Sequence, residues 1–261
     1  MSTRVECVSA LIGLKIRFPQ SFNQISERTL AIKALNARFS GNSDYVELMK
    51  REEQMRSIMH DSVVRYSECS RTDEGHVFLV MDYVEGVPLS KLMFDRRVEE
   101  RELLIVAHRV LSGLVATHAQ GIVHRDLKPE NTMVWRAGVI KLMDFGIAHV
   151  FDAETMTQTG SLLGSPAHMA PEMIEGEKVD ERADIFALGT VLFWLATGEL
   201  PFEGKNAPQI LKRVLEGLFK NPEAVEPKVG QCFADIIRRC MSYDIEERYS
   251  TVREVATALD D

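Results

Sequence analysis

The sequence predicts an α+β protein with two lobes, a small antiparallel sheet with one helix followed by a larger, mostly helical lobe. Strand-like apolar runs predominate in roughly the first 82 residues, and one helical pattern interrupts them. Beyond about residue 89, apolar residues recur at helical spacing instead. We therefore expect a single domain over residues 1–261, with an N-terminal lobe at about 1–82, a connection at about 82–88 and a C-terminal lobe at about 89–261.

Strand and helix signals alternate in the N-terminal lobe. An apolar run over residues 28–33 ends in Lys33. Residues 63–66 and 76–81 flank the turn-forming sequence Asp73-Glu74-Gly75, which predicts a β-hairpin whose second strand is buried on both faces. Between these strands, a helix is predicted over 44–59 from four apolar residues at helical spacing: Leu48, Met55, Ile58 and Met59.

Helical patterns dominate the C-terminal lobe. Residues 185–195 are apolar almost all round, which indicates a helix buried in the core. An amphipathic helix is predicted around 233–241, and the last helix begins at Thr251, because Thr251 and Glu254 have capping-box spacing. Seven residues of an earlier segment share one helical face: Leu103, Val106, Ala107, Val110, Leu111, Leu114 and His118.

Composition restricts the classes of function. Apolar residues make up 45% of the chain and charged residues 27%, as in ordinary soluble enzymes. The formal net charge of −8 disfavours nucleic acid or an anionic membrane as the main partner. Four widely spaced cysteines without a Cys-x-x-Cys pair favour a reducing compartment over a disulfide scaffold or a zinc site.

The strongest functional signal is the run 124–131, His-Arg-Asp-Leu-Lys-Pro-Glu-Asn. A short strand is predicted directly after it, and a second apolar segment at 139–143 leads to Asp144-Phe145-Gly146. Two such strands would bring Asp126, Asn131 and Asp144 around one point. Phosphoryl transfer needs a carboxylate that orients the attacking hydroxyl and oxygen ligands that hold magnesium on the phosphates. The alternative is a polar turn that contains these residues by chance, and eight consecutive positions weigh against it.

These residues resemble the catalytic loop and the magnesium-binding loop of the eukaryotic-like protein kinase family. A particular likeness to the bacterial Hanks-type Ser/Thr kinases comes from residues 83–87 and 157–159. The resemblance implies a two-lobed protein kinase fold, in which Asp126 accepts the proton of the substrate hydroxyl and Lys128 neutralises the transferring phosphoryl group. Asn131 and Asp144 would bind magnesium, or manganese as the alternative ion.

The resemblance also implies an ATP site. Lys33, at the end of Leu30-Ala31-Ile32-Lys33, would bind the α- and β-phosphates. Residues 80–86 resemble the hinge between lobes, with Met81 as gatekeeper; the alternative is an ordinary strand end and turn. Four residues would contact the adenine or its surroundings: Ala31, Asp82, Val84 and Met133.

Residues 146–172 resemble the activation segment of the family, ending in Ala170-Pro171-Glu172. By this resemblance Glu172 forms a buried pair with Arg248, and Asp184 binds the backbone of the catalytic loop. Lys128, together with Ser165 before Pro166, favours Ser or Thr over Tyr as the phosphate acceptor.

Two threonines of the activation segment, Thr157 and Thr159, are candidate phosphorylation sites. A phosphate there adds roughly two negative charges and could order the segment by pairing with Arg125. The alternative is a solvated polar loop without such a role.

Two parts of the small lobe depart from the family pattern. In the window 11–18, where the family has a glycine-rich turn over the phosphates, only Gly13 matches a glycine. The segment either binds ATP with altered geometry or is a diverged or artefactual N-terminus. In the family, a glutamate of this helix pairs with the strand lysine, but Arg51 occupies that position here. We therefore select the adjacent Glu52, which is three residues before Met55 and so lies on the same helical face. The alternative is that Glu52 is a solvated surface carboxylate.

Three functional hypotheses follow. The leading one is a Ser/Thr protein kinase that uses ATP and magnesium, acts on protein hydroxyls and is activated by phosphorylation of its activation segment. The departures in the small lobe motivate a pseudokinase-like binding or scaffold module as the alternative. A small-molecule phosphotransferase of related fold ranks third, because such enzymes usually lack the region 164–172.

The expected partners are protein substrates with Ser or Thr acceptors. We expect no nucleic acid and no membrane contact from this chain, and a cytoplasmic location. The oligomeric state stays open, with a transient dimer among the possibilities, as does the choice between a free-standing kinase and an excised domain.

Overall fold

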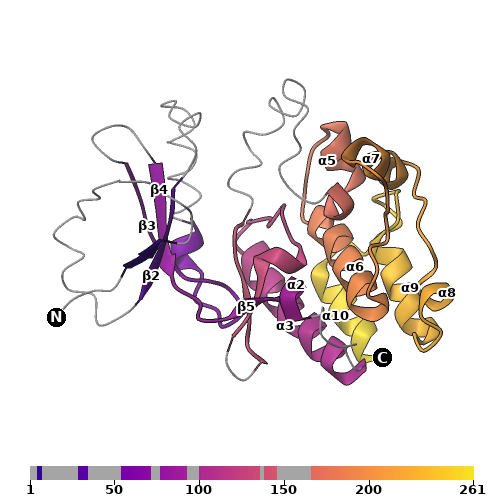
Figure 1. Ribbon diagram of the computed structural model, residues 1–261, viewed down its shortest axis with the longest axis horizontal. Coiled ribbons are helices and arrows are strands. Elements are labelled where there is room, and N and C mark those ends of the chain that lie inside the picture. The colour runs from indigo at the N-terminus through magenta and orange to yellow at the C-terminus, as the bar shows by residue number, and fades with distance from the viewer. Residues whose placement is uncertain are drawn as a thin grey trace.

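The computed structural model describes residues 5–7, 29–34, 54–71, 77–92, 100–135, 138–145 and 166–261, and it shows a strand-rich lobe beside a larger helical lobe (Figure 1). This arrangement confirms the predicted α+β class with two lobes. No helix in the described part of the chain is long and apolar enough to span a membrane.

The small lobe is built on a four-stranded sheet with the strand order β1-β2-β4-β3. Strands β2 and β3 both run antiparallel to β4, as predicted. Strand β1 runs parallel to β2, with Val5 opposite Leu30, which the sequence did not predict. The strands comprise Val5–Cys7 (β1), Leu30–Ala34 (β2), Tyr66–Arg71 (β3) and Val77–Asp82 (β4).

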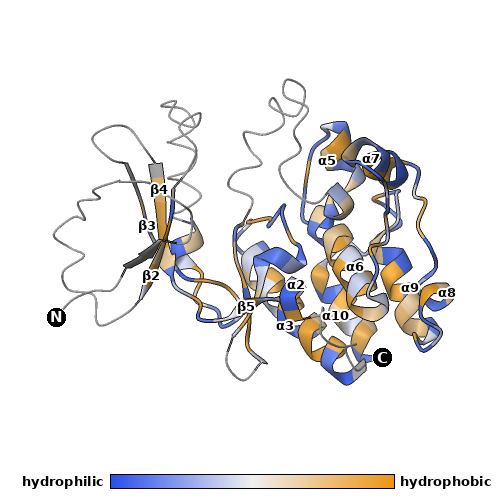
Figure 2. Ribbon diagram, viewed as in Figure 1, coloured by the Kyte–Doolittle hydropathy of each residue, from blue (hydrophilic) through white to orange (hydrophobic). Residues whose placement is uncertain are grey.

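Both faces of β4 are buried, which explains why this strand is continuously apolar. Phe78 and Val80 pack with Leu30 and Ile32 in a separate cluster on one face. Leu79 and Met81 alternate with them and belong to the main core. Figure 2 shows β4 in apolar colours between its neighbours.

Two details of the small lobe differ from the prediction. Strand β3 begins at Tyr66, where the predicted strand was to end, because Val63 forms an isolated bridge with Leu142 of the large lobe instead. Backbone bonds from the Val64 amide to the Leu142 carbonyl (3.0 Å) and from the Leu142 amide to the Ser62 carbonyl (2.8 Å) accompany this bridge. The helix predicted over 44–59 ends before Met59, because helical geometry in the described residues covers 54–57 and does not continue to residue 59; the exposed fraction of Met59 is 69%.

A second sheet, with the order β5-β6-β7, lies at the boundary between the lobes. The antiparallel pair β6 and β7 places Thr132 opposite Leu142, so that Asn131 comes next to Met143. The amide of Met143 donates to the carbonyl of Asn131 at 2.9 Å. The strands comprise Val87–Pro88 (β5), Thr132–Val134 (β6) and Ile140–Leu142 (β7), and the short helix α2 (Leu89–Leu92) follows β5.

The large lobe surrounds helix α6 (Arg182–Thr197), in which residues 183–193 and Leu195 are buried, as its apolar sequence predicts. Helix α3 (Glu100–His118) and helix α9 (Gln231–Cys240) both contact α6. The other helices in the described part of this lobe are α5 (Pro171–Glu175), α7 (Ala207–Leu215), α8 (Pro222–Val225) and α10 (Val252–Asp260).

The last helix has the predicted capping residue, Thr251, directly before its first residue. The Thr251 hydroxyl caps α10 by accepting from the Glu254 amide at 3.3 Å. The Glu254 carboxylate accepts from the Ser250 amide at 3.0 Å, one residue earlier than a capping box requires.

Candidate active site

The catalytic loop, residues 124–131, is fixed to the core through one buried carboxylate. Asp184 on α6 has no exposed surface, and its oxygens accept from the backbone amides of His124 (2.7 Å) and Arg125 (2.8 Å). His118 Nε2, at the end of α3, lies 2.7 Å from the same carboxylate. Bonds to a charged acceptor are about twice as strong as neutral ones, so Asp184 holds this turn of backbone firmly.

Asp126 lies at the centre of a polar cluster made by the loop itself. The Lys128 ammonium donates to both carboxylate oxygens, at 2.7 and 2.8 Å. The side-chain nitrogen of Asn131 donates to the Asp126 carboxylate (2.7 Å) and to the Asp126 carbonyl (2.8 Å). The Asp126 carboxylate is therefore held in one orientation, and the amide oxygen of Asn131 faces away from these bonds.

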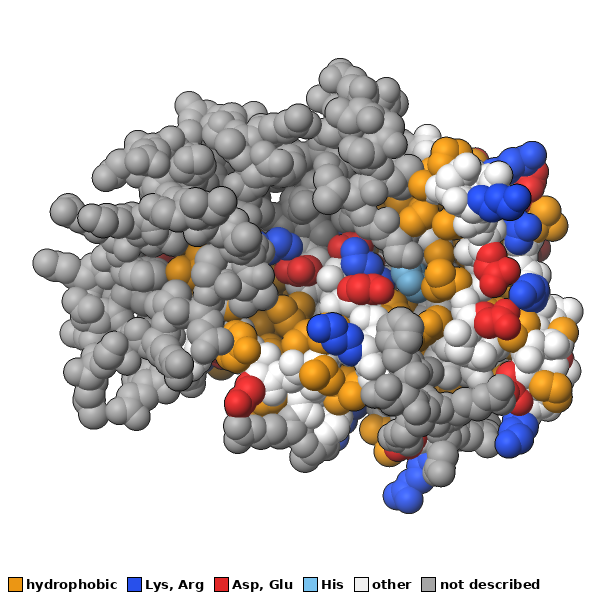
Figure 3. Space-filling view, in the orientation of Figure 1, with side chains coloured by type: hydrophobic (Ala, Val, Ile, Leu, Met, Phe, Trp, Pro, Cys, Tyr) orange, Lys and Arg blue, Asp and Glu red, His pale blue; other side chains and the backbone are white. Residues whose placement is uncertain are grey.

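Lys33 and Asp144 meet across the boundary between the lobes. Lys33 lies on β2 of the small lobe, and its ammonium donates to Asp144 Oδ1 at 2.8 Å. Both side chains keep about a third of their surface exposed, so the pair is accessible from solvent. Acidic and basic side chains gather along the middle of the face in Figure 3, between the two lobes.

The backbone is strained at two positions of this site. Arg125 (φ 63°) and Asp144 (φ 56°) are the non-glycine residues with positive φ in the described part of the chain. This conformation costs roughly 1–2 kcal/mol for an ordinary residue. At Arg125 the strain is offset by the bond to Asp184, and at Asp144 the side chain is held by Lys33.

The predicted adenine-binding residues line the junction of β2, β4 and the second sheet. Ala31 is buried and lies opposite Met81 in the sheet. The Asp82 amide donates to the Arg65 carbonyl at 2.9 Å, and the Val84 carbonyl accepts from the Gly86 amide at 2.8 Å. Met133 is half-buried on β6.

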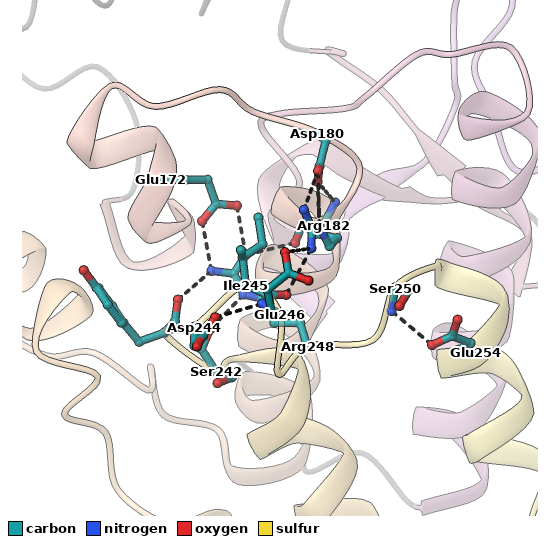
Figure 4. A network of polar contacts seen from close by, with 11 residues as sticks. Glu172, Asp180, Arg182, Ser242, Asp244, Ile245, Glu246, Arg248, Ser250 and Glu254 are labelled. Carbon is teal, nitrogen blue, oxygen red and sulfur yellow. Dashed lines mark hydrogen bonds and ion pairs between the residues drawn. The ribbon is translucent and has the colours of Figure 1, made fainter.

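Glu172 and Arg248 come together as the sequence led us to expect. Two parallel bonds of 2.9 Å join the guanidinium to the carboxylate, and both side chains are nearly inaccessible to solvent. The other N–H groups of Arg248 donate to backbone carbonyls (Figure 4), so that all five are used. Those carbonyls belong to Arg182, Ser242 and Tyr243.

One residue near the site was not singled out from the sequence. His168 ends the short 3-10 turn Pro166–His168, is buried, and lies within the electrostatic influence of Lys128 and Asp126. Burial, and then the charge of Lys128, lower the pKa of His168 to about 4. A histidine within an apolar turn gives no periodic signal, so burial and partners had to come from the structure.

Four predicted residues lie outside the described part of the chain: Gly13, Glu52, Thr157 and Thr159. Their predicted roles in ATP binding, in pairing with Lys33 and in phosphorylation stay predictions.

Comparison with known proteins decides the family. The model of the protein kinase domain family matches residues 19–259. This chain belongs to the protein kinase domain family. The kinase domain is 33% identical over 242 residues to the serine/threonine-protein kinase PrkC of Bacillus subtilis, and 34% identical over 237 residues to PknH of Mycobacterium tuberculosis.

These alignments cover 90% of this chain but only 37% and 38% of the two relatives, so the kinase domain spans less than two fifths of their length. A crystal structure of Rad53 residues 1–466 in complex with AMP-PNP superposes with a TM-score of 0.71 at 23% identity, covering 87% of this chain and 56% of that one. This likeness shows the fold of the kinase domain.

We predict that Arg248→Met destabilises the kinase domain by about 3–5 kcal/mol, because it leaves the Glu172 carboxylate buried without a cation. Arg238→Met is the control: Arg238 pairs with Glu223 but is a quarter exposed, so its loss should cost about 1 kcal/mol or less. Urea denaturation of both variants measures the difference, and equal losses would contradict the prediction.

We also predict a pH-dependent stability term from His168. The unfolded chain binds a proton at His168 near pH 6.5, whereas the folded protein binds it only near pH 4, so stability present above pH 6.5 is lost as the pH falls to 4. The shift corresponds to about 3 kcal/mol.

The measurement compares the unfolding free energies of wild type and His168→Asn across this range. The difference should move by about 3 kcal/mol in favour of the variant as the pH falls. His124, whose pKa burial also lowers, is present in both proteins and does not affect the difference. A difference independent of pH would refute this assignment.

Proposed function

We propose that this domain is a Ser/Thr protein kinase, which transfers the γ-phosphoryl group of ATP to serine and threonine hydroxyls of proteins. The observation that carries the proposal is the arrangement of Asp126, Lys128 and Asn131 in one bonded cluster, with the Lys33–Asp144 pair on the adjoining segments. The names of the bacterial relatives, which are serine/threonine-protein kinases, support the choice of acceptor.

In this proposal the Asp126 carboxylate orients the acceptor hydroxyl and takes its proton. Lys128, bonded to both oxygens of Asp126, holds that carboxylate in place and offsets charge on the transferring phosphoryl group. Lys33 binds the α- and β-phosphates, and its present partner Asp144 keeps its ammonium at the boundary between the lobes. Ala31, Asp82, Val84 and Met133 bind the adenine.

Asn131 and Asp144 fit the role of magnesium ligands. Both offer the hard oxygen donors that Mg²⁺ prefers, and the amide nitrogen of Asn131 is already used by Asp126, which leaves its oxygen for a cation. No group of three or more His, Cys, Asp or Glu that could hold a metal occurs in the described part of the chain. Two protein ligands suit a cation that arrives with nucleotide phosphates, whose negative charge it neutralises.

The segment that ends at Glu172 is proposed to dock the protein substrate beside Asp126. Support comes from the buried turn Pro166–His168, in which His168 lies within the electrostatic influence of Lys128, and from the Glu172–Arg248 pair. Phosphorylation at Thr157 or Thr159 would regulate this segment. A reducing, cytoplasmic location suits the free thiols of Cys232 and Cys240.

The test is phosphate transfer from radiolabelled ATP to myelin basic protein, a generic acceptor, with Asp126→Asn as the decisive variant. Removing the base should lower the turnover number by about 10²–10⁴-fold while the KM for ATP changes little. Asp61→Asn, at an exposed residue, should behave like wild type. Transfer by Asp126→Asn at the wild-type rate would contradict the proposed role of Asp126. No transfer by wild type, even after phosphorylation of the activation segment, would contradict the proposed kinase activity and favour a binding module.

A further inference from the structure

A buried hydrogen bond joins the turn Pro166–His168, here called the docking turn, to helix α6. His168 closes the turn Pro166–His168, all three residues of which are buried. Its Nδ1 lies 2.6 Å from the hydroxyl oxygen of Thr190, which is on α6 and has no exposed surface. The turn is therefore attached by a polar contact to the same helix that holds the catalytic loop through Asp184.

The direction of this bond follows from counting protons. The Thr190 hydroxyl donates its single proton to the Ala187 carbonyl at 2.6 Å, so its oxygen can only accept from the histidine. His168 must then carry its proton on Nδ1, and Nε2 is the unprotonated nitrogen. The neutral imidazole protonated on Nδ1 satisfies this geometry while the Thr190 hydroxyl keeps its bond to the Ala187 carbonyl.

The charged neighbours of His168 belong to the catalytic loop. Lys128 disfavours the protonated imidazole and Asp126 favours it, and these two groups are themselves bonded at 2.7 Å. Because burial is the largest cause of the lowered pKa, His168 stays neutral at neutral pH and adds no second cation beside Lys128. The neutral imidazole can therefore donate to Thr190 without placing a second positive charge within the electrostatic influence of Lys128.

We propose that His168 is a positioning residue, which sets the distance between the docking turn and the Asp126–Lys128 pair through its bond to Thr190. The proposal rests on the function proposed above, because it concerns how a protein acceptor is held for transfer. At the far end of the segment, the Glu172–Arg248 pair fixes the chain independently. Without the His168–Thr190 bond, the turn can shift relative to Asp126 while that end stays anchored.

The simpler explanation is that His168 only fills space, and substitutions can separate the two. His168→Phe keeps a ring and removes the donor, whereas His168→Asn places an amide nitrogen where Nδ1 lies and keeps the donor. Thr190→Val removes the acceptor from the other side and leaves the histidine in place. Thr117→Val is a matched control, since Thr117 is also a fully buried helical threonine whose hydroxyl donates three residues back, to Leu114, at 3.0 Å.

The experiment measures steady-state phosphate transfer to myelin basic protein with each variant, varying ATP and acceptor separately. His168→Phe and Thr190→Val should each raise the KM for the acceptor by about 5–20-fold, the loss expected when a buried bond is broken, with the KM for ATP within twofold of wild type. His168→Asn should bring the acceptor KM to within about threefold of wild type, and Thr117→Val should not raise it. The double variant His168→Phe/Thr190→Val should be no worse than the single ones, because both remove one bond.

The outcomes separate this inference from the proposed function. An acceptor KM within twofold of wild type in Thr190→Val, or equal rises in the KM for ATP and for acceptor, would show that the bond only stabilises the fold. The same conclusion follows if Thr117→Val has the effect of Thr190→Val. Absence of transfer by wild type would instead contradict the proposed function itself.

Discussion

The structure depends on one buried charge, the carboxylate of Asp184. A carboxylate with no exposed surface is costly unless charged or polar donors surround it. Those donors are the amides of His124 and Arg125 and the ring of His118. Burial of helix α6 therefore requires the amides of the catalytic loop to bond Asp184. The core packs and the catalytic loop forms together for this reason.

The remaining parts of the site follow from this constraint by short steps along the backbone. Once His124 and Arg125 are held, the loop turns at Arg125 and presents Asp126 to Lys128 and Asn131. Strand β6 begins directly after Asn131 and pairs with β7, which ends just before Asp144. The large lobe thus supplies the carboxylates, and the small lobe contributes Lys33. Helix α6 also carries Thr190, so the turn Pro166–His168 has the same support.

Much of this could be predicted from the sequence, because the motif residues are consecutive and the core helices have strong periodicity. The buried helix at 185–195, the two strands that follow the catalytic loop and the proximity of Asp126 and Asn131 were all predictable. Contacts that depend on where an element ends were not. Met59 continues the helical spacing of Met55 and yet is exposed, because a helix boundary leaves no trace in periodicity. His168 and Thr190 are 22 residues apart and no motif pairs them, so their bond required coordinates.

The most direct test of this account is the effect of Mg²⁺ on AMP-PNP binding to wild type and Asp184→Asn, measured by calorimetry. The substitution directs side-chain N–H groups at backbone amides that need an acceptor, so the catalytic loop should lose its support. We expect Mg²⁺ to strengthen nucleotide binding to wild type by about tenfold or more, and we expect Asp184→Asn to lose most of that gain. A folded Asp184→Asn protein that keeps the full magnesium effect would contradict the claim that Asp184 positions the site.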